Sequence, residues 1–71
     1  MIKFNSKLFK AERKKAGFTQ ETFAIRLRKD FPKASKSLVS YWERGTTPHA
    51  PYLSVIARIL GKDVSFFLTQ K

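Results

Sequence analysis

The chain has 71 residues, no cysteine and a formal net charge of +10 at pH 7. This length allows one small domain, 1–71, and without cysteine neither a disulfide framework nor a thiolate metal site can stabilise it. The excess of Lys and Arg, 15 against 5 Asp and Glu, favours a polyanionic partner: nucleic acid, an anionic membrane or an acidic protein.

The positive charge is concentrated in the first part of the chain. Residues 1–44 carry 12 of the Lys and Arg residues, whereas residues 45–71 carry 3. We therefore expect the first part to face the polyanion and the second part to serve as scaffold. No apolar run approaches the roughly 18 residues of a membrane span. The first residues also lack the apolar segment of a secretory signal, so a cytoplasmic location is expected.

Residues 6–16 are predicted to form the first helix. Asn5 or Ser6 can act as its N-cap, because their side-chain oxygens can accept an N–H of the first turn. Gly17 can adopt the left-handed conformation just past its end. The basic residues before that glycine suit the negative end of the helix dipole.

Residues 19–29 are predicted to form the second helix. Thr19 is its expected N-cap, and Phe18 and Phe23 have the spacing of a hydrophobic staple across that cap. Pro32 disfavours helical backbone in the residue before it, so we expect the helix to end near residues 29–30.

Residues 36–44 are predicted to form the third helix. Ser35 is its expected N-cap, and Gly45 follows its end. Val39 and Trp42 are three positions apart and therefore share one face, which is predicted to be buried. The remaining face of this helix is polar and only modestly charged.

Two further helices are predicted, over residues 50–60 and 64–68. The first has apolar residues at helical spacing and ends at Gly61, and Asp63 can cap the second. No segment shows the alternating pattern of a strand. The sequence therefore predicts an all-α fold with five short helices.

Two stretches of the sequence resemble a known family. Residues 19–24 (TQETFA) are similar to the T/S-Q-x-x-x-A start of the second helix in the Cro/C1-type (XRE) helix-turn-helix family, which includes the phage repressors. Residues 37–45 (SLVSYWERG) are similar to the recognition helix of that family and its E-x-G ending. Thr47-Pro48 and the two last helices also match, so the resemblance covers about residues 8–68. It implies a five-helix, lambda-repressor-like DNA-binding domain.

The interval between Ala24 and Glu43 departs from the family pattern. It is longer than usual and has no glycine in the turn; residues 28–33 (RKDFPK) occupy the additional length. We therefore expect an expanded turn between the second and third helices. Three basic side chains in that stretch suggest that the turn itself approaches phosphates.

The resemblance implies that the exposed face of the third helix reads base edges in the major groove. On that face lie Lys36, Ser37, Ser40 and Tyr41. Trp42 is one helix step, about 100°, from the tyrosine and continues the buried stripe, so only the tyrosine is expected to point outward.

The resemblance also implies contacts that position the protein on the DNA backbone without reading sequence. They are expected at the start of the second helix, in the expanded turn and in the loop after the third helix. The candidate residues are Thr19, Gln20, Thr46 and Thr47, to which we add the basic residues Lys33 and Arg44.

A structural ion pair is implied between Arg13 and Glu43. In the family, an Arg of the first helix meets a Glu at the end of the recognition helix. Here the pair would hold the third helix against the first. His49 is assigned no role.

The function expected from these features is that of a transcriptional regulator, of the repressor class, that binds double-stranded DNA sequence-specifically. We expect it to act as a homodimer on a two-fold operator. Phe66, Phe67 and Leu68 either form the dimer surface or close the core. The alternative is an antitoxin or adaptor-type module of the same fold that mainly binds protein. No constellation for catalysis, metal or cofactor binding is present in the sequence, so we expect no enzyme activity, no cofactor and no small-molecule substrate. A basic amphipathic membrane binder is disfavoured because every apolar stripe is needed for one core.

Overall fold

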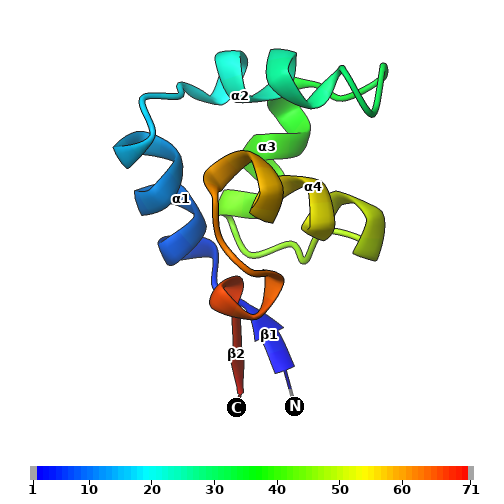
Figure 1. Cartoon of the computed structure of the whole chain (residues 1–71). Helices are drawn as coiled ribbons and strands as arrows, with labels where there is room; N and C mark the ends of the chain where they lie inside the picture. Colours follow the sequence, from blue (N-terminus) through cyan, green and yellow to red (C-terminus); the bar gives the residue numbers. More distant parts are fainter. Residues whose placement is uncertain (1, 71) are drawn as a thin grey trace.

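A computed structural model describes residues 2–70 of the chain, without the side chains of residues 2, 69 and 70. Within this part, four α-helices are followed by a short 3-10 helix, and a strand lies at each end. The helices are α1 (Ser6–Lys15), α2 (Gln20–Leu27), α3 (Lys36–Glu43), α4 (Ala50–Leu60) and the 3-10 helix η1 (Val64–Phe67). The strands are β1 (Ile2–Phe4) and β2 (Leu68–Gln70). Figure 1 shows α1, α2 and α4 arranged around α3, with the two strands side by side at one end.

Side-chain caps begin the first three helices. Asn5 Oδ1 accepts the Leu8 N–H at 3.0 Å at the start of α1. Thr19 and Thr22 form a capping box at the start of α2, each side chain accepting the other's backbone N–H. At the start of α3, Ser35 Oγ accepts from Leu38. All three caps lie where the sequence predicts them, because a cap depends only on residues close in sequence.

The helix ends differ slightly from the prediction. Helix α4 occupies the expected residues, and Gly61, its C-cap, has the left-handed φ of +69°. Helix α2 ends at Leu27, earlier than expected, because the Asp30 N–H bonds to the Leu27 carbonyl in a tighter turn. The connection that the sequence predicts to be expanded runs from Arg28 to Ser35.

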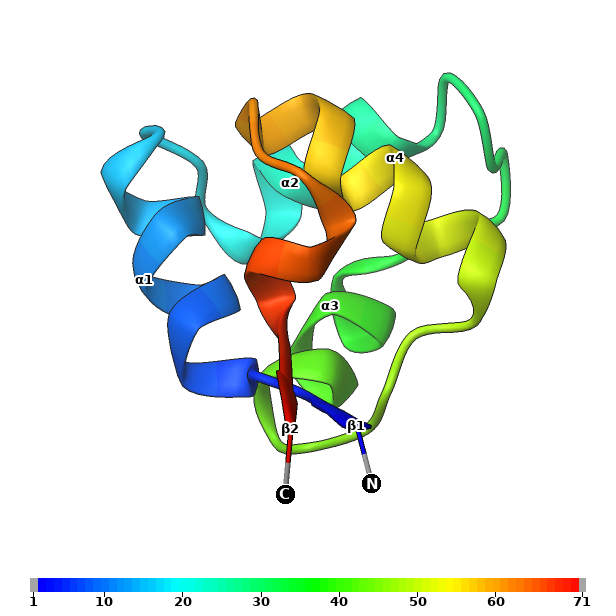
Figure 2. The same ribbon diagram turned by 60° about the horizontal axis from the view of Figure 1, so that its bottom comes forward.

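The prediction was wrong at the two ends of the chain. The segment expected as a fifth helix over 64–68 is the 3-10 helix Val64–Phe67, and Leu68 already belongs to β2. Strand β2 pairs with β1 in antiparallel register, with Phe4 opposite Leu68. In both views the termini therefore lie together (Figures 1 and 2). Three-residue strands are too short to show an alternating pattern, and their pairing joins opposite ends of the chain.

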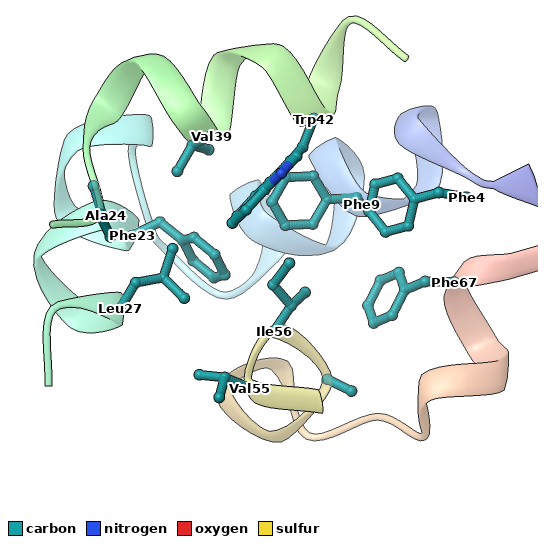
Figure 3. Close-up of a cluster of buried hydrophobic side chains, with 12 residues drawn as sticks. Phe4, Phe9, Phe23, Ala24, Leu27, Val39, Trp42, Val55, Ile56 and Phe67 are labelled. Atoms are coloured by element: carbon teal, nitrogen blue, oxygen red, sulfur yellow. The ribbon is translucent and has the colours of Figure 1, made fainter. Parts of the chain in front are cut away.

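The core is built around the ring of Phe9, which is fully buried. Its centroid lies 5.6 Å from that of Phe4, 5.5 Å from that of Phe23 and 6.5 Å from that of Phe67. It also lies 6.1 Å from the Trp42 ring of α3, at an edge-to-face angle of 73°. Figure 3 shows these rings together, with side chains of α2 and α4 completing the cluster. One aromatic side chain thus contacts side chains of β1, α2, α3 and η1, and through them α3 is held in a fixed place.

Candidate nucleic-acid interface

Helix α3 has one buried face and one exposed face. Val39 and Trp42 are buried, with Trp42 2% exposed. Lys36 and Ser37 are exposed, and the Tyr41 side chain is 51% exposed. The outward direction of Tyr41 and the inward direction of Trp42, which the sequence predicts from their helix positions, are confirmed.

The four residues expected to contact bases do not share the same accessibility. Lys36, Ser37 and Tyr41 are exposed, whereas Ser40 is only half-buried. Helical periodicity places Ser37, Ser40 and Tyr41 along one side of α3, because positions three and four apart are neighbours on a helix. The accessible part of α3 is therefore its first turn together with the ring of Tyr41.

The ring of Tyr41 is stacked by an arginine. The guanidinium carbon of Arg44 lies 4.9 Å from the Tyr41 ring centroid, which is a cation–π contact. Such a contact contributes about 0.5–1 kcal/mol at an exposed site. The contact places a positive charge beside the end of the exposed face. It also restricts the rotamers that both side chains can adopt.

A buried hydrogen-bond network connects α3 to the two preceding helices. Arg13 Nε donates to Glu43 Oε2 at 2.5 Å, and the two side chains are 6% and 5% exposed. Gln20 Nε2 donates to Glu43 Oε1 at 3.0 Å. Arg13 also donates to the Phe18 carbonyl, in the turn between α1 and α2. The structure thus brings together the Arg13 and Glu43 side chains, and it adds Gln20 to them.

The contact of Gln20 changes what its side chain can offer a ligand. Its amide nitrogen donates to Glu43, inside the network rather than outward. The backbone N–H groups of Gln20 and Glu21 remain, because the first N–H groups of a helix have no partner within it and the capping box bonds only those of Thr19 and Thr22. An anion bound at the start of α2 would therefore accept hydrogen bonds from backbone N–H groups rather than from the Gln20 side chain.

A shallow surface hollow lies where α1, α2 and α3 meet. The start of α2 forms one side, with Thr19 and Gln20, and Lys36 of α3 forms another. Lys14 at the end of α1 also lines it. The lining residues are Arg13, Lys14, Gly17, Phe18, Thr19, Gln20, Glu21 and Lys36. This combination of two exposed lysines and a helix N-terminus is suited to an anion.

The remaining expected phosphate contacts lie outside this hollow. Lys33 is exposed in the connection before α3, and Arg44 is the C-cap of α3. Thr46 and Thr47 are exposed in the loop that follows, where the Thr46 N–H bonds back to the Tyr41 carbonyl. Candidates thus lie before the start of α3 and after its end.

Two contacts at this surface have no signal in the sequence. One is the hydrogen bond from Gln20 to Glu43, and the other is a hydrogen bond from Arg28 Nε to the Ala34 carbonyl at 2.8 Å. Both depend on how helices pack or how a connection turns, so spacing along the chain does not reveal them.

The comparison with protein families agrees with this geometry. A family model described as helix-turn-helix matches residues 9–67, which is most of the chain. The chain therefore belongs to the helix-turn-helix family of the Cro/C1 (XRE) type. This is a family of DNA-binding domains found in transcription regulators and generally without enzyme activity. No curated protein and no solved structure gives a significant match to the chain.

Residues 2–70 show neither a membrane-spanning helix nor a cluster of metal ligands. No helix in this part is long and apolar enough to cross a membrane. The same residues contain no group of three or more His, Asp or Glu side chains that could hold a metal ion.

Proposed function

We propose that the chain is a sequence-specific regulator of transcription, acting as a repressor, that reads the major groove of double-stranded DNA with α3. The observation that carries this proposal is the exposed first turn of α3 beside the electropositive hollow at the start of α2. An α-helix fits the major groove, and its N-terminal residues reach base edges in this docking geometry. A phosphate in the hollow would fix the register of the helix in the groove.

The proposed base contacts are those of the exposed edge of α3. Lys36 can donate to O6 and N7 of guanine, and Ser37 and Ser40 can donate or accept. Tyr41 can offer its hydroxyl, or its ring can pack against a thymine methyl group. The stacked Arg44 supports this role because it holds the ring in place.

The proposed phosphate contacts surround these residues. At the start of α2, Gln20 acts through its backbone N–H, since its side-chain amide donates to Glu43. Thr19 acts through its hydroxyl, since its backbone N–H donates to Thr22 Oγ1. Lys33 contacts the backbone on one side of the groove. Arg44, Thr46 and Thr47 contact it on the other side.

Binding as a homodimer to a two-fold site is part of this proposal. Phe66 is 40% exposed, whereas the neighbouring Phe67 is fully buried, so only one of the two rings is needed for the core. Half-sites would lie about 34 Å apart, one turn of the duplex. We expect Phe66→Ser to weaken binding to a duplex with two half-sites. Binding to a single half-site should stay within twofold of that of the unmodified protein.

Selection of bound sites from a random duplex library tests the proposal. We expect an enriched sequence with two-fold symmetry. Its affinity should fall steeply as salt rises, because each neutralised phosphate releases counterions. Placed over a promoter, the selected sequence should reduce transcription of a reporter gene when the protein is present. If the library yields no preferred sequence, the proposal that α3 reads DNA bases is wrong. The alternative, that the chain is a module that mainly binds protein, then explains the fold better.

A further inference from the structure

Hydrogen bonds within the connection between α2 and α3 give it a fixed shape. The Phe31 N–H donates to the Leu27 carbonyl at 2.9 Å, and the Ala34 N–H donates to the Phe31 carbonyl at 2.9 Å. The Arg28 side chain spans the connection, because its Nε donates to the Ala34 carbonyl at 2.8 Å. Residues near its beginning are thus bonded to residues near its end.

The Arg28 bond lies directly beside the start of α3. Arg28 is the C-cap of α2, and Ala34, which is 2% exposed, precedes the N-cap Ser35. One side chain therefore links the last turn of α2 to the residue before the N-cap of α3. Any shift of Ala34 would carry with it Lys36 and Ser37, which immediately follow the cap.

The connection is also held from the side of α4. The ring of Phe31 lies 4.2 Å from that of Tyr52, and the Tyr52 ring lies 5.2 Å from that of Trp42 in α3. Arg58 of α4 donates to Asp30 at 2.8 Å, although this ion pair is exposed and contributes little by itself. The connection is thus held against α4, and the Tyr52 ring of α4 also contacts α3.

We propose that Arg28 is a positioning residue for sequence recognition: its hydrogen bond to Ala34 holds the first turn of α3 in the orientation that reads bases. It does so without binding a phosphate itself. Judged by charge alone, Arg28 belongs with Lys29 and Lys33 as a basic residue of the connection. All three side chains are exposed, but Arg28 Nε also donates a hydrogen bond to the Ala34 carbonyl. The effect on recognition rests on the function proposed above.

Two neutral variants separate the hydrogen bond from the charge. Arg28→Gln and Arg28→Met both remove the positive charge and keep an unbranched side chain of good helix propensity. The Gln amide nitrogen occupies the place along the side chain where Arg has Nε, so R28Q can still donate to Ala34. R28M cannot. Lys33→Gln is the matched control, because it removes an exposed charge from the same connection.

The first measurement uses the free protein. The Leu38 and Val39 N–H groups bond to Ser35 in the first turn of α3. We expect their hydrogen exchange in R28M to be about tenfold faster than in the unmodified protein, as the loss of one hydrogen bond implies. In R28Q it should stay within about twofold. Equal exchange in all three proteins would overturn the proposal, and this result does not depend on DNA binding.

The second measurement compares the duplex selected from the random library with a scrambled duplex of the same length, over a range of salt concentrations. We expect R28M to lose about tenfold in the ratio of the two affinities, and R28Q to lose less than about twofold. The ratio is insensitive to the fraction of folded protein. Both variants should keep the salt slope of the unmodified protein, whereas K33Q should lower it by about 0.9.

A different result would overturn the proposal: R28Q and R28M lose the same affinity for both duplexes, and their salt slope falls by about 0.9. This result would show that Arg28 binds a phosphate. If R28M does not fold, Arg28→Leu replaces it, since Leu is also neutral, has no donor and has good helix propensity. If the unmodified protein binds neither duplex, the proposed function fails. The exchange experiment still decides whether Arg28 holds the start of α3.

Discussion

Glu43 accepts hydrogen bonds from two other helices and so controls the orientation of α3 at the scale of a single residue. Arg13 donates to it through Nε, and Gln20 donates through its amide nitrogen. Both charged side chains are almost fully buried, so each depends on the other for compensation. A buried ion pair adds little net stability compared with apolar packing, but its disruption leaves an uncompensated charge.

Glu43→Gln is expected to lower the free energy of unfolding by about 3–5 kcal/mol, because it leaves the buried Arg13 cation without an opposite charge. Urea denaturation measures this change. Asp30→Asn is the control, since its ion pair with Arg58 is exposed and should contribute less than about 1 kcal/mol. If both variants lose a similar free energy of unfolding, burial of the Arg13–Glu43 pair does not explain its effect.

A second prediction at this scale concerns Ser37. Its side chain is exposed on the first turn of α3, where the proposed function puts a base contact. Ser37→Ala is expected to relax the base preference at one position of the selected site by about 1–3 kcal/mol and to leave the unfolding midpoint nearly unchanged. Binding to single-base variants of that site measures the preference. A uniform loss over all variants would mean that Ser37 does not read a base.

At the scale of an element, the start of α2 combines a stabilising cap with a surface for anions. The capping box of Thr19 and Thr22 satisfies N–H groups of the first turn. The same turn lines the hollow that contains Lys14 and Lys36. Stability and phosphate binding therefore depend on the same turn. A negative charge there can preserve the cap, but it weakens phosphate binding.

Thr19→Ala and Thr19→Asp separate these two roles. The Ala variant is expected to lose about 1 kcal/mol of unfolding free energy, because it removes the cap. The Asp variant should recover that loss, since Asp is a good N-cap. It should nevertheless bind DNA more weakly than the Ala variant, because its negative charge faces the phosphates. Urea denaturation and a duplex titration of both proteins test this, and stronger DNA binding by the Asp variant would contradict it.

At the scale of the whole molecule, Phe9 connects the interface to the rest of the chain. Its ring contacts Phe4 near the N-terminus, Phe67 near the C-terminus and Trp42 of α3. A chain of this size buries only about 60% of its unfolded surface, so its free energy of unfolding is small. The cost of a single cavity in the core is therefore a large fraction of that free energy.

Phe9→Ala is expected to cost about 3–5 kcal/mol, which would leave the domain marginally folded or unfolded. Circular dichroism with urea or heat measures the loss. Phe66→Ala is the matched control: it removes a ring of the same type that is 40% exposed, and it should cost much less. Equal losses would mean that the core is not centred on Phe9.

Local sequence was enough to predict the four α-helices, the side-chain caps of the first three and the two faces of α3. These features depend on residues within one or two turns of each other, such as Ser35 with Leu38, or Tyr41 beside Trp42. Residues 19–24 and 37–45 also indicated the family. The net charge of +10 indicated a polyanionic partner.

The contacts between residues far apart in the sequence follow from tertiary packing and have no local signal. Strand β1 pairs with β2 although the two lie at opposite ends of the chain, and neither has a pattern of its own. Gln20, which the sequence suggests as a phosphate contact, donates to Glu43, and Arg28, one of three basic residues in the turn, donates to the Ala34 carbonyl. A polar side chain has the same chemistry in either role. Which partner it meets depends on how the helices pack, and local sequence does not encode that directly.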